Sequence, residues 1–415
     1  MQQSLTDFRG NVPYGKQSRI EKNEEKEQLR NKIFVGDNLT CLNKKREIFK
    51  NSIDFIYIDP PYNTSSRFSY EDCNDSWEKD IKARLYAAKE WMKMSSAIFI
   101  SIDDNELASL TKICFEVFGK SNYVGSFITR QSQRSNAKHI NIVHEYVVCF
   151  AKDKKKLPPF RIRRMDIPED RDMIVDIQKQ VRNSLIPEDT LKLLIKKYAA
   201  ERGITWLKNY CNVDKDGRIF FAKDLSVPGK PSSLEIPEIG LSLPPLKSRK
   251  WSSSQKFIQL YKAGRLHFKN WRPYEIEYLD ETEDNIPSIL PFYSRNGTED
   301  LKKLGLYRFF DTPKPVELIK FLIRASLHSN SVILDFYAGS GTTAQAVYEI
   351  NKEDGRQHSY IMIQSPEKIN KATYVYENMT ACGYVNPSVS DITELRIKTF
   401  LEKEKMQPDY VIEHI

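Results

Sequence analysis

The chain has 415 residues, 40% of them hydrophobic and 11% aromatic, which excludes an intrinsically disordered protein and allows a large core with an inserted domain. Its 64 lysines and arginines outnumber 56 acidic residues, and the net charge of +8 suits a polyanionic partner without demonstrating one. The six cysteines contain no CxxC pair, and no stretch approaches about 18 consecutive apolar residues. We therefore expect no zinc site, no disulfide framework, no membrane span and a cytoplasmic location.

The predicted elements begin after a polar segment. Residues 1–30 end in a run of charges and are expected to form a solvated N-terminal arm. Short apolar runs then predict buried strands at residues 33–35, 53–58, 97–102, 123–128 and 146–150. Helical patterns follow two of these runs, at 79–94 and 103–118, with Asp103 or Asp104 as a candidate N-cap and Gly119 as a candidate end. This alternation predicts a largely parallel α/β sheet, with residues 31–152 as its first half.

Residues 153–285 break this rhythm and are expected to form an inserted domain. The segment is charged and rich in proline, and one helix is predicted near residues 189–202. The α/β pattern resumes over 286–390, with a helix at 316–328, a strand at 332–335, a helix reaching about residue 350 and a strand at 360–363. Residues 391–415 are expected to be a C-terminal extension.

A glycine-rich turn joins the predicted strand 332–335 to the following helix. It contains Gly339 and Gly341, and glycine lets the backbone approach a nucleotide-like ligand closely because it has no Cβ. Asp335 at the end of the strand suggests a polar contact with the methionine part of S-adenosylmethionine, with Phe336 lining the pocket.

The same turn also fits the dinucleotide fingerprint, through Gly339, Gly341 and Ala344. That fingerprint expects an acidic residue about 20 positions later, on the next strand, to bind the ribose of NAD. Here the next strand ends at Gln364, with Glu367 beyond it, so a NAD-dependent oxidoreductase is disfavoured.

A second motif, Asp59-Pro60-Pro61-Tyr62, follows directly after the predicted strand 53–58. An exocyclic aromatic amine is a poor nucleophile because its lone pair is delocalised into the ring. The Asp59 carboxylate can accept one N–H of such an amine, and the Pro60 carbonyl, held by the rigid proline pair, can accept the other. Tyr62 offers a ring face on which a base flipped out of the duplex can stack. The motif predicts direct methyl transfer without a covalent intermediate or a metal.

With Gly36-Asp37-Asn38-Leu39 and Thr312-Pro313-Lys314-Pro315, these motifs resemble, in type and order, those of the β-group amino-methyltransferases of DNA. More narrowly, they resemble the modification (Mod) subunit of Type III restriction–modification systems over roughly residues 30–390, and residues 144–152 and 351–355 support this. The resemblance implies a Rossmann-like S-adenosylmethionine-dependent methyltransferase fold, with a mostly parallel sheet, helices on both faces and an inserted target-recognition domain. It also implies site-specific methylation of N6 of a flipped adenine in double-stranded DNA.

The resemblance implies that Asp37 helps to hold the adenine of S-adenosylmethionine, while the Thr312–Pro315 and Asp335–Thr342 segments enclose its methionine end. The candidate cofactor residues are Asp37, Asn38, Thr312, Lys314, Pro315, Asp335, Phe336, Ala338, Gly339, Ser340, Gly341, Thr342 and Gln364. Alternatives stay open for three of them. Asp37 could be a plain turn residue, Lys314 could point to solvent at a helix start, and Glu367 could replace Gln364 at the ribose.

The inserted domain carries basic and aromatic residues together at 247–251 and 267–272, which suits DNA, although buried tryptophans beside solvated lysines would give the same pattern. The polar, basic stretch 129–138 is expected to be a mobile loop near the DNA.

Two other functions remain to be weighed. N4 of cytosine is also an exocyclic amine, although in the resembled family an Asp at the first motif position goes mainly with adenine. The chain could also be a catalytically silent DNA-recognition subunit. A homodimer and a restriction (Res) subunit are candidate partners, and the chain is short beside typical Mod subunits.

Overall fold

The computed structural model describes residues 31–64, 76–131, 138–184, 188–201 and 203–415. The chain divides into two compact units, unit 1 within residues 1–160 and 287–415 and unit 2 over Arg161–Ile286. The predicted arm at 1–30 and residues 132–137 of the predicted DNA loop lie outside the described residues. Within the described ranges, no helix combines the length and the apolar composition needed to cross a bilayer.

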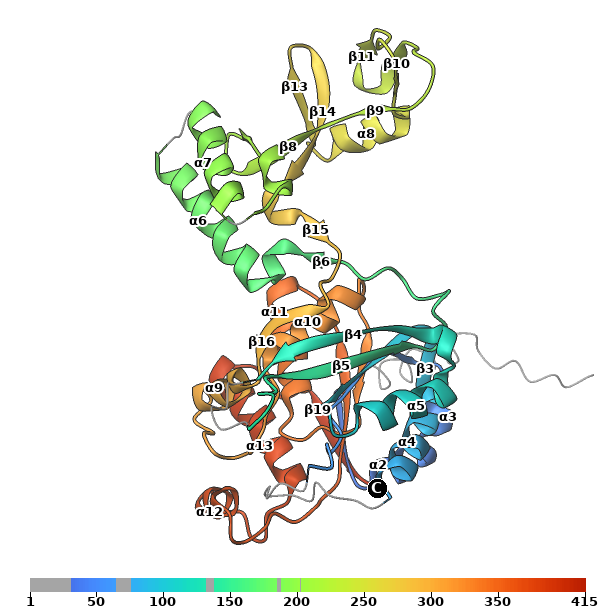
Figure 1. The fold of residues 1–415 in the computed structure, drawn as a ribbon, viewed down its shortest axis with the longest axis vertical. Coiled ribbons are helices and arrows are strands. Elements are labelled where there is room, and N and C mark those ends of the chain that lie inside the picture. The colour runs from blue at the N-terminus through green and yellow to red at the C-terminus, as the bar shows by residue number, and fades with distance from the viewer. Residues whose placement is uncertain (1–30, 65–75, 132–137, 185–187, 202) are drawn as a thin grey trace, which may run out of the picture. The chain divides into compact units, whose positions relative to one another are not determined.

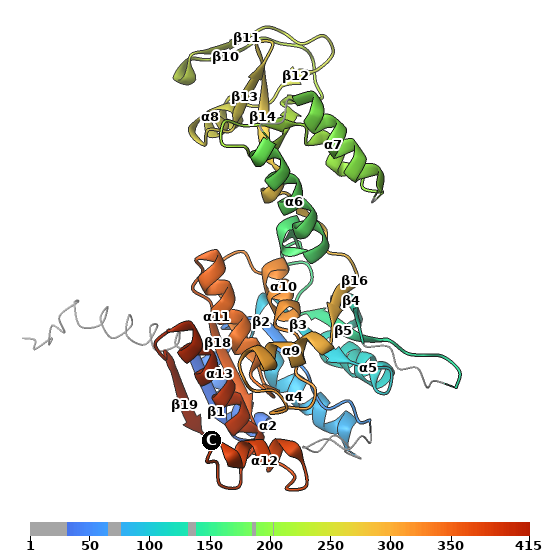
Figure 2. The ribbon, with the colours of Figure 1, turned by 90° about the vertical axis from the view of Figure 1, so that its left-hand side faces the viewer.

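Unit 1 is built on a large sheet (Figures 1 and 2). As far as the chain is described, the sheet has nine strands in the order β16-β4-β5-β3-β2-β17-β18-β1-β19. Its strands are β1 (Asn31–Val35), β2 (Ile53–Ile58), β3 (Met92–Ile102), β4 (Tyr123–Arg130), β5 (His144–Ala151), β16 (Ile289–Tyr293), β17 (Val332–Asp335), β18 (Ser359–Gln364) and β19 (Tyr410–His414). Strand β5 runs antiparallel to both of its neighbours, and the other pairings are parallel.

Helices cover both faces of this sheet (Figures 1 and 2). One face carries α2 (Asn38–Lys44), α3 (Arg46–Phe49), α4 (Trp77–Trp91) and α5 (Leu107–Phe118), and the other carries α10 (Val316–Ser326), α11 (Thr342–Asp354) and α13 (Val389–Glu404). Two further helices are α9 (Arg295–Lys303) and α12 (Tyr374–Ala381). Because side chains alternate along a strand, Ile56 and Ile58 of β2 join the core with Leu85 of α4, whereas Phe55 stacks on Phe99. The expected Rossmann-like arrangement is confirmed.

The two predicted functional loops start from neighbouring strands. In the parallel pairing of β2 with β17, Phe55 lies opposite Ile333 and Ile56 opposite Leu334. From β2 the chain continues to β3 on one side, and from β17 it continues to β18 on the other side. The strand order therefore reverses between β2 and β17, and ligands of open α/β sheets bind at the carboxyl ends of strands at such a point.

Two predictions for the helices of unit 1 need correction. The helix expected at 79–94 ends at Trp91, and β3 begins at Met92 with no intervening turn residue to signal the change. Neither Asp103 nor Asp104 caps α5, because Asp103 instead accepts a hydrogen bond from the Asn105 amide in a turn and the helix begins only at Leu107. Gly119 does end α5, with a positive φ of 88°.

The expected C-terminal extension, 391–415, also differs. It contributes most of α13 and all of β19, which pairs with β1 in the main sheet. These last elements therefore belong to the body of unit 1.

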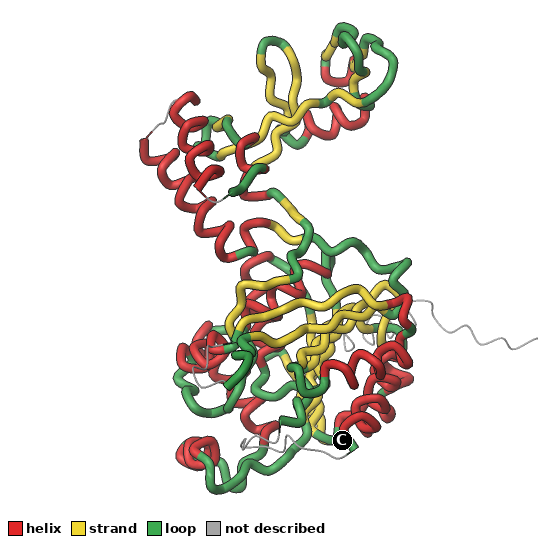
Figure 3. Tube along the Cα trace, in the orientation of Figure 1, coloured by secondary structure: helices red, strands yellow, loops and turns green. Residues whose placement is uncertain are grey.

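Unit 2 combines helices with small antiparallel sheets (Figure 3). Its elements are β6 (Ile162–Arg163), α6 (Pro168–Ser184), α7 (Glu188–Glu201), β7 (Asn212–Val213), β8 (Ile219–Asp224), β9 (Ser226–Val227), β10 (Leu234–Ile236), β11 (Leu241–Leu243), β12 (Lys250–Trp251), α8 (Ser254–Lys262), β13 (Leu266–Lys269), β14 (Arg272–Tyr278) and β15 (Glu283–Asp284). The strands β6 and β15 pair with each other, so the two ends of the unit are tied together.

The sequence pattern predicted α7 but missed α6 and α8. Pro168 at the first position of α6, followed by Glu169 and Asp170, is a normal helix start, since proline has no amide hydrogen to lose there and acids favour the positive end of the helix dipole. The sequence pattern predicts only one helix in the inserted domain, near residues 189–202, so α6 and α8 are additions to it.

Candidate active site

A cavity of about 780 Å³ lies in unit 1 and is lined by both predicted loops. The predicted site residues that line it are Asp37, Asn38, Asp59, Pro60, Pro61, Tyr62, Thr312, Lys314, Asp335, Phe336, Ala338, Gly339, Ser340, Thr342 and Gln364. Glu367 lines it as well. Two predicted residues do not: Pro315 is the N-cap of α10, and Gly341 is the N-cap of α11. Segments more than 250 positions apart therefore meet at one cavity.

The Asp-Pro-Pro-Tyr loop is held from both sides. The Trp77 indole donates a 2.7 Å hydrogen bond to the Pro61 carbonyl, and Asn63, with a positive φ of 58°, donates to Glu106 at 2.8 Å. These contacts fix the backbone next to Pro60, whose carbonyl is one of the two predicted acceptors.

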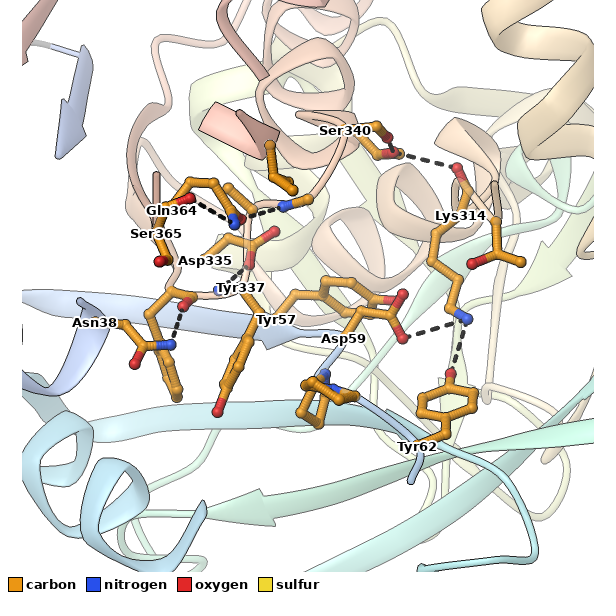
Figure 4. A pocket seen from close by; sticks show the side chains of 18 of the residues that line it. Asn38, Tyr57, Asp59, Tyr62, Lys314, Asp335, Tyr337, Ser340, Gln364 and Ser365 are labelled. Carbon is orange, nitrogen blue, oxygen red and sulfur yellow. Dashed lines mark hydrogen bonds and ion pairs between the residues drawn. The ribbon is translucent and has the colours of Figure 1, made fainter. Parts of the chain in front are cut away.

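Lys314 is the centre of a buried charged cluster (Figure 4). Its Nζ lies 3.2 Å from Asp59 Oδ1 and 3.0 Å from Glu145 Oε2, and it donates a 2.7 Å hydrogen bond to the Tyr62 hydroxyl. The Lys314 side chain is 9% exposed, so the alternative of a solvent-facing lysine is wrong. At Asp59 Oδ1 the contact is an ion pair without hydrogen-bond geometry, and this buried oxygen accepts no hydrogen bond from any described residue.

The two carboxyl groups of the cluster differ in acidity. Burial raises the pKa of Asp59, the nearby Glu145 charge adds to this rise, and the Lys314 ammonium opposes it. Burial also acts to raise the pKa of Glu145, but the Lys314 ion pair and hydrogen bonds from Lys314 and Gln131 outweigh it and lower that pKa. Burial disfavours the Lys314 ammonium, yet the two carboxylates raise its pKa. Burial therefore favours the protonated form of Asp59, whereas the contacts of Glu145 favour its ionised form.

A second set of contacts links the start of α2 to the glycine loop. Asp37 accepts a 2.8 Å hydrogen bond from the Thr40 amide and so caps α2, while Arg84 Nη2 lies 3.1 Å from its other oxygen. Asn38 donates a 2.8 Å hydrogen bond to the Phe336 carbonyl. Asp37 therefore has the local structural role that the alternative interpretation gave it, and it also lines the cavity.

The glycine loop is fixed by the strand ends beneath it. Gln364 Oε1 accepts a 2.7 Å hydrogen bond from the Gly339 amide, at a position where φ is 52°. Asp335 accepts from the Tyr337 amide at 3.0 Å and from the Thr343 hydroxyl at 2.6 Å. Burial raises the pKa of Asp335 to about 7. A buried carboxyl with this pKa is poised to ionise when a cation binds beside it.

The sequence did not single out three residues that shape this site: Glu145, Arg84 and Trp77. Arg84 lies among other charged residues of α4, and the roles of Glu145 and Arg84 depend on contacts between distant segments. One signal was available, since Glu145 begins the apolar run of a buried strand, where an unpaired carboxylate would be costly.

Comparison with known proteins finds a matching family, sequence relatives and similar solved structures. A family described as DNA methylase matches residues 53–374. The Mod subunit of the Type III restriction–modification enzyme EcoPI, from Escherichia phage P1, is 29% identical over 93% of this chain and 64% of its own length. The Type II methyltransferase M.KpnI of Klebsiella pneumoniae is 28% identical over 88% of this chain and 86% of its own length.

The chain spans 65% of the length of a further relative, the EcoP15I Mod subunit of Escherichia coli, at 25% identity over 92% of this chain. Among solved structures, the cytosine-N4-specific PvuII DNA methyltransferase aligns over 89% of this chain and 93% of its own, with 12% identity and a TM-score of 0.40. Because the family match covers more than three quarters of the sequence, the chain belongs to the DNA methylase family.

Proposed function

We propose that this protein transfers a methyl group from S-adenosylmethionine to an exocyclic amine of a base in double-stranded DNA, and that the atom modified is N6 of adenine. The observation that carries the proposal is the shared cavity, which the Asp-Pro-Pro-Tyr loop after β2 and the glycine loop after β17 line together. The choice of adenine rests on Asp59 at the first position of the motif, as in the resembled adenine enzymes.

The cavity suits S-adenosylmethionine in size and in polar groups. Its volume of about 780 Å³ lies within the roughly 300–1,000 Å³ of small-molecule sites. Asp37 and Asn38 line the side proposed for the adenosine, and Asp335 lies at the glycine loop, where a buried acid can meet the ammonium of the amino-acid end. When bound, the cofactor supplies a methyl group on a positively charged sulfur.

The chain's own residues would activate the amine. Asp59 Oδ1 is a buried oxygen that pairs with the Lys314 ammonium at 3.2 Å but accepts no hydrogen bond from the described residues, so it can still accept an N–H of the base. The Pro60 carbonyl would accept the second N–H, and together they would return electron density to the nitrogen. The raised pKa of Asp59 also suits a group that takes up the amine proton after transfer. The proposal includes no covalent enzyme intermediate and no metal.

Tyr62 would hold the flipped base. Its ring is fixed through the hydroxyl, which accepts from Lys314 at 2.7 Å, and this leaves the anchoring contact at the edge of the ring. Stacking on an aromatic ring contributes about 1–3 kcal/mol per base, comparable with a flipping cost of a few kcal/mol.

Unit 2 is proposed to recognise DNA. The β13–β14 hairpin turns through Asn270 and Trp271, and the Trp271 side chain is 95% exposed. Lys269 precedes this turn and Arg272, which pairs with Asp224 at 2.8 Å, follows it, so a ring able to stack on bases lies in a basic stretch of the sequence. A homodimer and a bacterial cytoplasmic location are also proposed, and a restriction (Res) subunit is proposed because the relatives include Mod subunits of Type III restriction–modification enzymes.

The test is methyl transfer from radiolabelled S-adenosylmethionine to mixed-sequence duplex DNA, followed by mass analysis of the released nucleosides. N6-methyladenine is the expected product. N4-methylcytosine would overturn the choice of base and keep the chemistry. Binding of both DNA and S-adenosylhomocysteine without any methylated product would instead identify a silent recognition subunit.

A further inference from the structure

Arg396 on α13 is a fully buried arginine that the proposed chemistry does not use. Its side chain has 0% exposure, although arginine is almost never fully buried unless it is paired with an acid. Burial lowers the pKa of Arg396 to about 10, so the guanidinium still carries its charge at neutral pH. A buried charge costs several kcal/mol unless other groups compensate it.

The hydrogen bonds of this guanidinium all go to neutral oxygens. Nε donates to Gln345 Oε1 at 2.9 Å, and Nη1 donates to Ser340 Oγ at 2.8 Å and to Thr342 Oγ1 at 2.7 Å. Nη2 is buried and has no hydrogen-bond partner among the described residues. The positive charge therefore lacks an acid in direct contact.

The two acids whose charges act on Arg396 are engaged elsewhere. Asp300 and Glu349 act on Arg396 electrostatically, but Asp300 accepts from the Val316 amide and Glu349 pairs with Lys320. A carboxylate that balances the Arg396 charge by direct contact must therefore come from a group other than Asp300 and Glu349.

Arg396 lies directly behind the glycine loop. Its partners Ser340 and Thr342 both line the cavity, as does Val389 at the start of α13. Thr393 Oγ1 donates a 2.6 Å hydrogen bond to the Gly339 carbonyl, so α13 is packed against the loop. At Gly341 a Cβ would come within 3.1 Å of the Thr393 carbonyl, and φ there is 81°, which explains why glycine is needed for this close approach.

This arrangement leaves the Ser340 hydroxyl able to donate, whereas the Thr342 hydroxyl donates to the Lys314 carbonyl at 3.3 Å. Ser340 and Thr342 accept hydrogen bonds from a cation, and a hydroxyl polarised in this way becomes a stronger donor through its own hydrogen. At neutral pH the only anionic group of S-adenosylmethionine is the carboxylate of its methionine part. Asp335 at the start of the loop and Arg396 behind its end thus provide opposite charges for a zwitterionic amino acid.

We infer that Arg396 is a positioning residue for the cofactor's carboxylate, which it attracts by its charge and binds through the hydroxyl group of Ser340. This inference rests on the proposed use of S-adenosylmethionine. It adds a C-terminal helix to the cofactor site, at a residue that does not itself line the cavity.

The test compares two ligands by calorimetry on the full chain: S-adenosylhomocysteine, which has the carboxylate, and 5′-methylthioadenosine, which lacks the amino-acid part. We expect Arg396→Met to weaken S-adenosylhomocysteine binding at least tenfold and to change 5′-methylthioadenosine binding less than twofold. Arg396→Lys should be intermediate, because it keeps the charge and loses the forked donor geometry. Equal weakening of both ligands, or unchanged binding of S-adenosylhomocysteine, would overturn the inference.

A matched control is Lys320→Met, which removes another buried cation of unit 1, one that pairs with Glu317, Glu349 and Glu353. It should leave the affinity for both ligands unchanged even if it lowers the melting temperature. If Arg396→Met does not fold, Ser340→Ala gives the same test, with a selective loss expected for S-adenosylhomocysteine and an equal effect on both ligands contradicting the inference. If the unmodified protein binds neither ligand, the proposed function fails and not only this inference.

Discussion

The cavity of unit 1 and the hairpin tip of unit 2 depart from ordinary protein surfaces in opposite ways. In unit 1, charged side chains are buried, and Lys314 meets three polar partners within 3.2 Å. In unit 2, the large aromatic Trp271 is 95% exposed and sits at a positive φ of 64°. Each departure costs free energy of folding. The contrast suggests that fixed charges serve the chemical step, while an exposed ring serves contact with a large partner.

The largest effect is expected for Asp59→Ala, which tests the buried charged cluster of unit 1. We expect methyl transfer to fall by about 1,000-fold, because the variant loses the acceptor that activates the amine. Binding of S-adenosylhomocysteine, measured by calorimetry, should change less than threefold, since the ligand's proposed contacts lie on other residues. A variant that still methylates DNA at a near-normal rate would exclude Asp59 as the activating group.

Lys314 and Glu145 give a pair of predictions with opposite signs. Lys314 lowers the pKa of Asp59 and Glu145 raises it, and Asp59 must be ionised to accept the amine hydrogen. Lys314→Met should reduce the maximal rate by about 100-fold and move the acid side of the pH–rate profile to higher pH. Glu145→Gln should move that limb to lower pH. Shifts in the same direction for both variants would contradict the proposed electrostatics.

Tyr62→Ala tests the stacking role. Loss of about 1–3 kcal/mol of stacking predicts a roughly 5- to 150-fold weaker capture of the flipped base, seen as reduced fluorescence of 2-aminopurine placed at the target. Tyr62→Phe is the matched control, because it keeps the ring and removes only the hydroxyl that meets Lys314. An equal loss of base capture and cofactor affinity in Tyr62→Ala would argue for a purely structural tyrosine.

Asp335 predicts a pH dependence of cofactor binding. With a pKa of about 7 it is mostly protonated at pH 6, and a bound ammonium favours its ionised form. Affinity for S-adenosylhomocysteine should therefore rise about tenfold between pH 6 and pH 8, and Asp335→Asn should remove that rise. The effect on folding has the opposite sign: because the folded pKa exceeds the unfolded one, this group stabilises the fold at low pH and loses that contribution as pH rises through 7.

The smallest expected effect concerns the exposed Trp271 ring of unit 2. Both central residues of the β13–β14 turn have positive φ, a conformation that favours asparagine and glycine and disfavours tryptophan. Trp271→Gly should leave the melting temperature unchanged or raise it, since it relieves strain of about 1–3 kcal/mol. It should also weaken DNA binding by roughly fivefold in a fluorescence titration. A loss of stability with unchanged DNA affinity would show that the ring is structural.

Sequence patterns predicted the parts of this fold that local chemistry dictates. The apolar runs of β2 and β17 and the motifs that follow them identified both loops before their spatial relation was known. That the two loops meet depends on the strand order, which the family resemblance implied and the pattern of apolar runs did not. The helices of unit 2 were harder to predict, because the charged residues of α6 hide an apolar face formed by Met173, Ile174, Ile177 and Val181.

The charged contacts could not be predicted in the same way. The partners of Lys314 come from β5 and from the loop after β2, so their distances depend on tertiary packing. Arg396 follows a helical pattern in which a charged residue normally faces solvent. Only the placement of α13 against the glycine loop shows that this arginine is buried.

The joined ends of unit 2 have a consequence for how specificity can change. Strands β6 and β15 pair where the chain enters and leaves the unit, at Ile162 opposite Asp284 and Arg163 opposite Glu283. All nine strands of the main sheet lie outside these junctions. A different module could therefore be exchanged at two neighbouring points without breaking a strand pair around the cavity. Replacement of the whole of unit 2 could then give a new target sequence, while the residues around the cavity stay unchanged.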